Sequence, residues 1–127
     1  MSDMNITTRD GNTAFEPGSQ IFGEAFWRMD EPAESIEARL LWHTEGKGSM
    51  DSAVVQTATF DRPAQEETRP FEMTLPIEPY SCSGKLVSIL WVIELVALPT
   101  KENIRLPLTM GPGGREIVLG TVKTDAK

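Results

Sequence analysis

Apolar and polar residues alternate with a period of two along most of the chain, and no window repeats apolar residues at the helical period of 3.6. Successive side chains of a strand point to opposite faces of a sheet, so each alternating stretch predicts one wall of a core. The strongest alternation occurs in 36–42, 71–75, 87–97 and 104–108. Weaker strand candidates occur in 5–9, 19–29, 52–60 and 116–124. The pattern therefore predicts a fold made of strands.

Turn-forming Gly, Pro, Asn and Asp residues separate these stretches at intervals of about 8–12 residues, which is typical of an all-β sandwich. We predict an immunoglobulin-like antiparallel β-sandwich of about seven or eight strands. Its inner walls should include Ile36, Leu40, Trp42, Phe71, Met73, Leu75, Val87, Ile89, Trp91, Ile93 and Leu95. We expect Trp42 and Trp91 to meet across the gap between the two layers. Residues 33–40 contain helix formers, but Pro32 and the alternation favour a turn that leads into a strand.

Two of the predicted strands have unusual features. The stretch 85–98 is the longest, and Leu90 and Val92 make its second face apolar as well. We therefore expect that face to be partly covered and the strand to contain a bulge or bend. In 52–60, Gln56 shares a face with Ala58 and Phe60, so its amide needs a buried partner if that face is inward.

The length and charge restrict the class of protein. The chain has 127 residues, which fits a single domain over 1–127, and 12 basic against 19 acidic residues give a net charge of −7. This acidic balance argues against nucleic acid and anionic lipid as partners. The most apolar stretch, 86–98, is too short for a membrane helix and contains Glu94, so we expect no membrane insertion. The first residues lack a signal peptide, and we expect a cytoplasmic location.

The sequence offers little catalytic or metal-binding chemistry. One cysteine, Cys82, and one histidine, His43, exclude an internal disulfide and a Cys/His zinc site, and we expect no cofactor. Residues 46–49 lack the first glycine of a phosphate-binding loop, so we interpret them as a turn. We interpret the acidic run over 24–37 as a solvated hairpin tip. We predict that the protein is not an enzyme. A hydrolase centred on His43 is the third hypothesis, after the two binding functions given below.

Three aromatic residues in 19–29 suggest a different class of function. Trp27 is in phase with Ile21 and Ala25, whereas Phe22 and Phe26 occupy the other face, so one aromatic of this group should be exposed. An exposed aromatic platform beside polar groups can bind a sugar or another small ligand. A carbohydrate- or small-ligand-binding β-sandwich is therefore the alternative function.

The order of these signals resembles the N-terminal domain of the arrestin-like clan. Residues 15–27 (FEPGSQIFGEAFW) show its proline-glycine turn, short apolar strand and glycine, and 36–42 (IEARLLW) resemble its next strand. The most specific segment, 71–84 (FEMTLPIEPYSCSG), is similar to the clan's F-x-F-x-L-P…P-x-S-x-x-G stretch and precedes the long apolar strand. The clan includes arrestins, α-arrestins, the arrestin-like subunit of retromer and bacterial sporulation-control proteins.

The resemblance implies an arrestin-type sandwich and a non-enzymatic adaptor or scaffold that binds a protein partner. The chain has room for one such sandwich, so the buried charged cluster between two arrestin domains is absent and no phosphate-sensing residue can be transferred. A partner could add a strand to an open sheet edge, or a second copy could form a homodimer. A lone sandwich could expose the face that a second one covers, and Leu90, Val92 and Val96 are the candidates for that face.

Overall fold

The computed structural model of the protein describes residues 2–46, 51–84 and 87–118, and in these ranges it contains ten strands, two single-turn 3₁₀ helices and no α-helix. Seven of these strands have six residues or more, and three have two. The strands are β1 (Asp3–Thr8), β2 (Ala14–Phe15), β3 (Gln20–Arg28), β4 (Ser35–Gly46), β5 (Ser52–Asp61), β6 (Glu66–Thr74), β7 (Cys82–Ser83), β8 (Val87–Leu98), β9 (Asn103–Met110) and β10 (Ile117–Val118). The short helices are η1 (Arg9–Gly11) and η2 (Pro112–Gly114).

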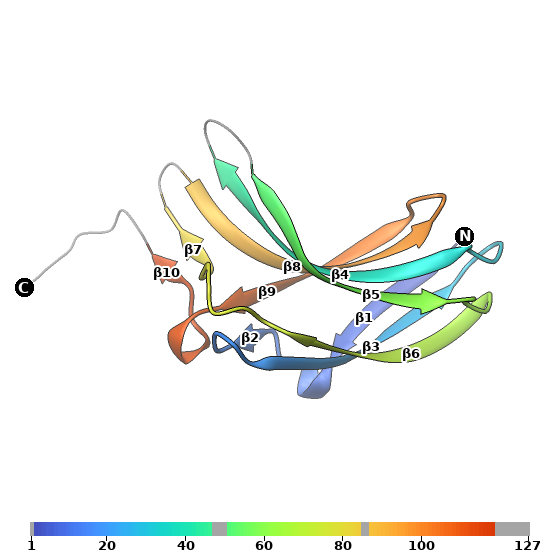
Figure 1. Ribbon diagram of the computed structural model, residues 1–127, viewed down its shortest axis with the longest axis horizontal. Helices are drawn as coiled ribbons and strands as arrows, with labels where there is room; N and C mark the ends of the chain where they lie inside the picture. The colour runs from blue at the N-terminus through green and yellow to red at the C-terminus, as the bar shows by residue number, and fades with distance from the viewer. Residues whose placement is uncertain (1, 47–50, 85–86, 119–127) are drawn as a thin grey trace, which may run out of the picture.

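The strands form two sheets packed face to face (Figure 1). The small sheet has the order β1-β3-β6, and the large sheet has the order β10-β7-β8-β4-β5, with β9 paired to β8 and, at its end, to β2. This arrangement confirms the predicted all-β sandwich. Segment 33–40 is a loop followed by the start of β4, as the alternation indicated.

Two details differ from the prediction: the direction of two short pairings and the extent of the last strand. The two-residue pairs β2–β9 and β7–β10 are parallel, whereas all pairs of longer strands are antiparallel. The strand predicted over 116–124 is described only as Ile117–Val118, and 119–127 lie outside the described residues. The turn interpreted at 46–49 also lies outside them, apart from Gly46.

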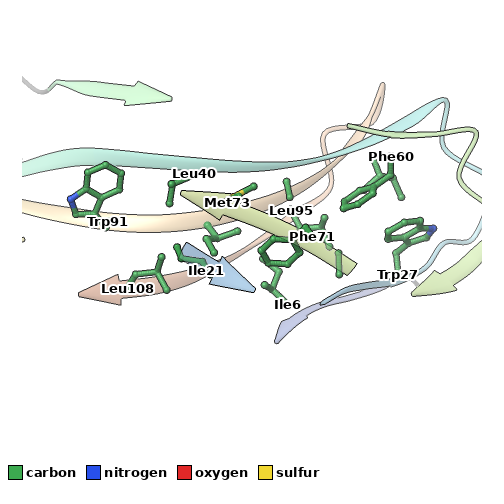
Figure 2. Packing of buried hydrophobic residues seen from close by; sticks show 14 of the residues in the cluster. Ile6, Ile21, Trp27, Leu40, Phe60, Phe71, Met73, Trp91, Leu95 and Leu108 are labelled. Atoms are coloured by element: carbon green, nitrogen blue, oxygen red, sulfur yellow. The ribbon is translucent and has the colours of Figure 1, made fainter. Parts of the chain in front are cut away.

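The core fills the space between the two sheets, and Figure 2 shows its side chains pointing into that space from both layers. Of the predicted inner walls, eight side chains are buried: Ile36, Leu40, Phe71, Met73, Leu75, Trp91, Ile93 and Leu95. Trp42 and Ile89 are half-buried, and the Val87 side chain lies outside the described residues. The alternation therefore identified the inward face of β4, β6 and β8.

The expected meeting of Trp42 and Trp91 across the gap was wrong. The two residues are register partners on the neighbouring strands β4 and β8 of one sheet. Partners on adjacent antiparallel strands place their side chains on the same face, so the two indoles lie side by side within one layer.

Of the bulge or bend expected in β8, the structure shows a bend, and the bulge lies in another strand. The register of β4 with β8 runs without a break from Ser35↔Leu98 to Gly46↔Val87. The shift occurs instead between β4 and β5, where Leu40 pairs with Gln56 and Leu41 pairs with Val54, which leaves Val55 unpaired. Figure 1 shows β8 bending smoothly along its length, so the long strand follows the curvature of the sheet.

Local chemistry explains the turns that frame the small sheet. The Ser19 amide donates to the Glu16 carbonyl at 3.2 Å, and Gly18 has φ +77°, as a type II turn requires. A Cβ atom at Gly23 would lie 2.4 Å from the Thr7 carbonyl oxygen and 2.7 Å from the Phe71 ring. Only glycine therefore allows β3 to lie this close to both groups. These two findings explain the proline-glycine turn and the following glycine that the sequence shows in 15–27.

At one end of the sandwich, the loop between β5 and β6 binds the loop between β3 and β4. The Met29 amide donates to the Gln65 carbonyl at 2.8 Å, and Gln65 Nε2 donates to the Met29 and Asp30 carbonyls. Asp30, Glu31 and Glu34 of the acidic run are exposed around this contact, as expected of solvated positions, but the predicted hairpin is wrong because β3 and β4 lie in different sheets. Met29 and Gln65 follow Arg28 and Glu66 in the register of β3 with β6, so the contact extends the small sheet at the end opposite β7 and β10.

Candidate binding surfaces

The structure corrects the contact role predicted for Trp27. Its side chain is fully buried, with 0% exposure, and its ring lies 5.4 Å from the Phe60 ring centre (Figure 2). Its indole Nε1 donates to the Ala64 carbonyl at 2.8 Å, which satisfies the one polar atom of the side chain. Trp27 is therefore a core residue, and it does not contribute to a sugar-binding platform.

Phe22 and Phe26 lie half-buried on the outer face of β3. The Arg9 guanidinium lies 4.2 Å above the Phe22 ring, and the two residues line a shallow hollow of about 340 Å³ with Thr7, Glu24 and Pro70. Because a cation already covers the face of Phe22, these residues do not form an open aromatic pair of the kind that the carbohydrate alternative requires.

Leu90, Val92 and Val96 lie on the outer face of the large sheet, opposite the core. Val92 and Val96 are only 5% and 4% exposed, and Leu90 is half-buried, so the open apolar patch expected of them is not present. Figure 1 shows the ends of the large sheet turning away from the small sheet, which makes this outer face concave. Side chains on a concave face crowd together, and this crowding explains how the valines are covered without a third layer.

A row of paired charges crosses the same outer face. Glu94 is the register partner of Arg39 on β4 and of Arg105 on β9. Its carboxylate lies 3.1 Å from Arg105 Nε and 3.8 Å from Arg39 Nη1, and its side chain is only 12% exposed. Arg39 also bonds Glu37 at 2.8 Å. These charges neutralise one another and contribute to the cover over the valines.

His43, the centre of the hydrolase hypothesis, lies beside this row. It lines a hollow of about 350 Å³ together with Asp51, Ser52, Glu94 and Arg105. Ser52 is its register partner on β5, yet among the described residues no hydrogen bond joins His43 to Ser52 or Asp51. The hollow therefore lacks the bonded nucleophile–base pair that a Ser–His–acid site uses.

The free edge of β5 is the surface that sequence reasoning missed. No charged residue and no proline occurs from Ser52 to Phe60, and Val54 and Val55 are 53% and 42% exposed. By contrast, Pro70 interrupts the β6 edge among charged neighbours, and Arg105 and Pro107 occupy β9. Charges and proline protect sheet edges against pairing with other chains, so β5 is the least protected of these three edges.

Gln56 closes the side of the sandwich where the β5 and β6 edges approach each other. Its Oε1 accepts a hydrogen bond from the Thr74 amide at 3.0 Å, and its side chain is half-buried. This bond supplies the partner that the sequence required for the Gln56 amide. It also occupies one donor of the β6 edge, so β6 is less available than β5 to an incoming strand.

The described ranges contain neither a metal-binding group of side chains nor a helix that could span a membrane. The residues of 2–46, 51–84 and 87–118 contain no group of three or more His, Cys, Asp or Glu side chains that could hold a metal ion. In the same ranges, no helix is long and apolar enough to cross a membrane. Cys82 is a buried free thiol in β7.

Comparison with known proteins supports the fold and leaves the function open. No protein-family model and no curated protein matches the chain. The solved structure of Spo0M, a sporulation control protein from Bacillus subtilis, has a TM-score of 0.58 and 18% identity, and the match covers 87% of this chain and 49% of Spo0M. A β-glucosidase from Listeria innocua in complex with gluconolactone has a TM-score of 0.48 and 11% identity, with coverages of 93% and 17%.

The likeness to Spo0M supports an arrestin-type sandwich, because sporulation-control proteins belong to the clan that the sequence resembles. At 18% identity it shows the fold alone. The chain spans about half the length of Spo0M.

Proposed function

We propose that the chain is a non-enzymatic protein-interaction module that binds an extended segment of a partner along the free edge of β5. The observation that carries this proposal is the nine-residue run from Ser52 to Phe60, which has neither charge nor proline on an outermost strand. An edge strand offers unpaired backbone donors and acceptors, and an added strand satisfies them while side chains of both strands set specificity. The arrestin-type fold supports an adaptor role by analogy.

The geometry around β5 is suited to strand addition. Thr57 and Thr59 are exposed, and they share the outer face with the paired charges of β4. Threonine has a high propensity for strands and keeps the edge soluble without repelling an acidic or a basic partner. The bulge at Val55 divides the edge, so Gln56–Phe60 is the longest straight segment that a partner can pair with.

The test compares two substitutions with the same change of charge. Thr59→Lys places a lysine on the β5 edge, and Thr68→Lys places one at an exposed position of β6. We expect Thr59→Lys to reduce the proteins captured from the native cell by about fivefold or more, because lysine opposes edge pairing, and Thr68→Lys to leave capture unchanged. Quantitative mass spectrometry of the captured proteins measures both.

Equal capture by the wild type and Thr59→Lys contradicts strand addition at β5. Equal losses in both variants also contradict it, because the effect then follows charge and not the edge. Sedimentation velocity of the same three proteins shows whether a second copy of the chain is the partner: a dimer that dissociates only with Thr59→Lys identifies it.

A further inference from the structure

A cleft opens at the end of the sandwich where β4 and β8 extend past the small sheet. Its volume is about 650 Å³, and its floor is the inner face of the large sheet. Figure 1 shows the ends of β4, β5 and β8 rising away from the small sheet at this end, with the connection from β6 to β7 on the opposite side. The lining residues are Trp42, Thr44, Asp51, Glu78, Pro79, Tyr80 and Ile89.

The aromatic walls of the cleft are held in place by the core. Trp42 lies beside Trp91, and both Trp42 and Tyr80 pack against the buried cluster while remaining half-exposed. Trp91 Nε1 donates to the Pro79 carbonyl at 2.8 Å, which ties the wall that carries Pro79 and Tyr80 to the large sheet. An indole and a phenol that the core holds in place therefore line this open cleft.

The charge of the lining has one sign. Asp51 and Glu78 are the charged residues among those that line the cleft, and both are exposed. The backbone of Asp51 is bonded to Thr44, but within the described residues neither carboxylate takes part in an ion pair. The net charge of the whole chain, −7, also favours the approach of a cation over that of an anion.

We propose that this cleft binds the side chain of a lysine or arginine presented by a protein partner. The aliphatic stem lies against Pro79 and Ile89, the cation lies at the faces of Trp42 and Tyr80, and Asp51 and Glu78 pair with it at the rim. Aromatic faces attract ammonium and guanidinium groups, and long cationic side chains pack their stems along apolar surface. An anionic group is repelled by the carboxylates, and a neutral apolar side chain leaves them without a partner.

This inference rests on the proposed function only in taking the source of the cation to be a protein partner. Asp51 immediately precedes β5, so a partner segment that continues past the bulge at Val55 toward Ser52 reaches the rim of the cleft. A partner strand could therefore place one basic side chain in the cleft while its backbone pairs with β5.

The experiment uses capped amino acids as probes, so it does not require the partner. The full chain is titrated with acetyl-arginine methylamide, acetyl-lysine methylamide and the neutral acetyl-norleucine methylamide up to about 20 mM, well above the millimolar dissociation constant expected of one side chain. Indole N–H signals are followed by NMR. We expect both cationic probes to shift the Trp42 signal, norleucine to shift it much less, and the buried Trp27 signal to stay unchanged.

Variants separate the parts of the cleft. Glu78→Gln should weaken binding of the arginine probe by about threefold to fivefold, whereas Glu72→Gln, an exposed glutamate on β6 outside the cleft, should have no effect. Tyr80→Leu should weaken it by a similar factor through loss of the aromatic face. Raising the salt concentration should weaken the binding of both cationic probes.

A Trp42 signal that does not move, or that moves equally with norleucine, overturns the cation site. Unchanged affinity in Glu78→Gln overturns the role of the rim. Spermidine binding more tightly than capped arginine contradicts a protein source and indicates a free polyamine. If the probes do not bind but Thr59→Lys still reduces capture, the cation site is wrong and the proposed function stands. If the probes bind but capture does not depend on the β5 edge, only the proposed function is wrong.

Discussion

Glu67 and Arg69 hold the turn that leads into β6. Arg69 Nε donates to Glu67 Oε2 at 2.7 Å, and the Ala64 amide donates to Glu67 Oε1 at 2.9 Å. The bond from Arg69 and then the bond from Ala64 lower the pKa of Glu67 below its ordinary value of 4.5, and Glu67 in turn raises the pKa of Arg69. The ionised carboxylate is thus the form that the folded turn favours.

The lowered pKa of Glu67 gives the stability of the fold a component that depends on pH. Because folding favours the charged form, this contribution is present above pH 4.5, the ordinary pKa, and is lost as the pH falls through the lower pKa of the folded protein. We expect Glu67→Gln to lower the urea midpoint slightly at pH 7 and at low salt, and the difference from wild type to shrink below pH 4.5. Glu72→Gln, which changes an exposed glutamate in the same strand, should leave the midpoint unchanged at both pH values. A difference for Glu67→Gln that persists at low pH would argue against this origin.

Trp27 shows what alternation reveals at the scale of one residue. The sequence placed it in phase with Ile21 and Ala25, and all three side chains are fully buried. The phase alone left the inward face open, because Phe22 and Phe26 place large apolar side chains on the other face as well. The deciding partner, the Ala64 carbonyl, is 37 residues away in sequence, and only the fold brings it to the indole.

Among the elements, the two edge strands on one side of the sandwich behave differently. β6 carries charges and a proline, and its Thr74 amide donates to the Gln56 side chain of β5. From Ser52 to Phe60, β5 has neither charge nor proline and carries a bulge at Val55. The uncharged run in β5 was visible in the sequence, but its meaning depended on β5 being outermost. Strand order follows from pairings between distant segments, so composition alone could not identify β5 as the open edge.

The bond between Gln56 and Thr74 allows a direct test of how the edges are closed. Gln56→Leu removes the acceptor, and we expect hydrogen exchange of the Thr74 amide to accelerate by about threefold to tenfold, as for the loss of one ordinary hydrogen bond. Gln56→Glu keeps an acceptor oxygen at this position and should preserve the protection of Thr74. Equal exchange rates in wild type and Gln56→Leu would mean that the bond does not protect this edge.

At the scale of the whole molecule, the curvature of the large sheet changes the meaning of its outer face. The apolar second face of β8 predicted partial cover, and the burial of Val92 and Val96 confirms it, whereas the exposed apolar patch also considered for them is not present. Curvature arises from the twist of all the strands together, so the pattern of a single strand could not predict it. Of the three residues predicted there, half-buried Leu90 is the most available to a partner.

Substitution by lysine should distinguish these positions. Val92→Lys forces a charge into a side-chain site that is 5% exposed, and we expect it to lower the free energy of unfolding by about 1–3 kcal/mol. Leu90→Lys should cost less than about 1 kcal/mol, since its side chain can reach solvent. Urea denaturation measures both, and light scattering of Leu90→Lys shows whether a self-associated wild type becomes monomeric. Equal destabilisation by the two changes would contradict the burial of the outer face.

The pairing of β4 with β8 at the centre of the large sheet also determines how the chain must fold. Ser35 pairs with Leu98 and Gly46 with Val87, so the central ladder joins segments separated by roughly 40 to 60 positions. Such non-local pairing slows folding to the millisecond-to-second range typical of all-β domains. During synthesis, β4 has only its β5 neighbour until the ribosome has released β8, and over that interval the growing chain depends on protection from premature association.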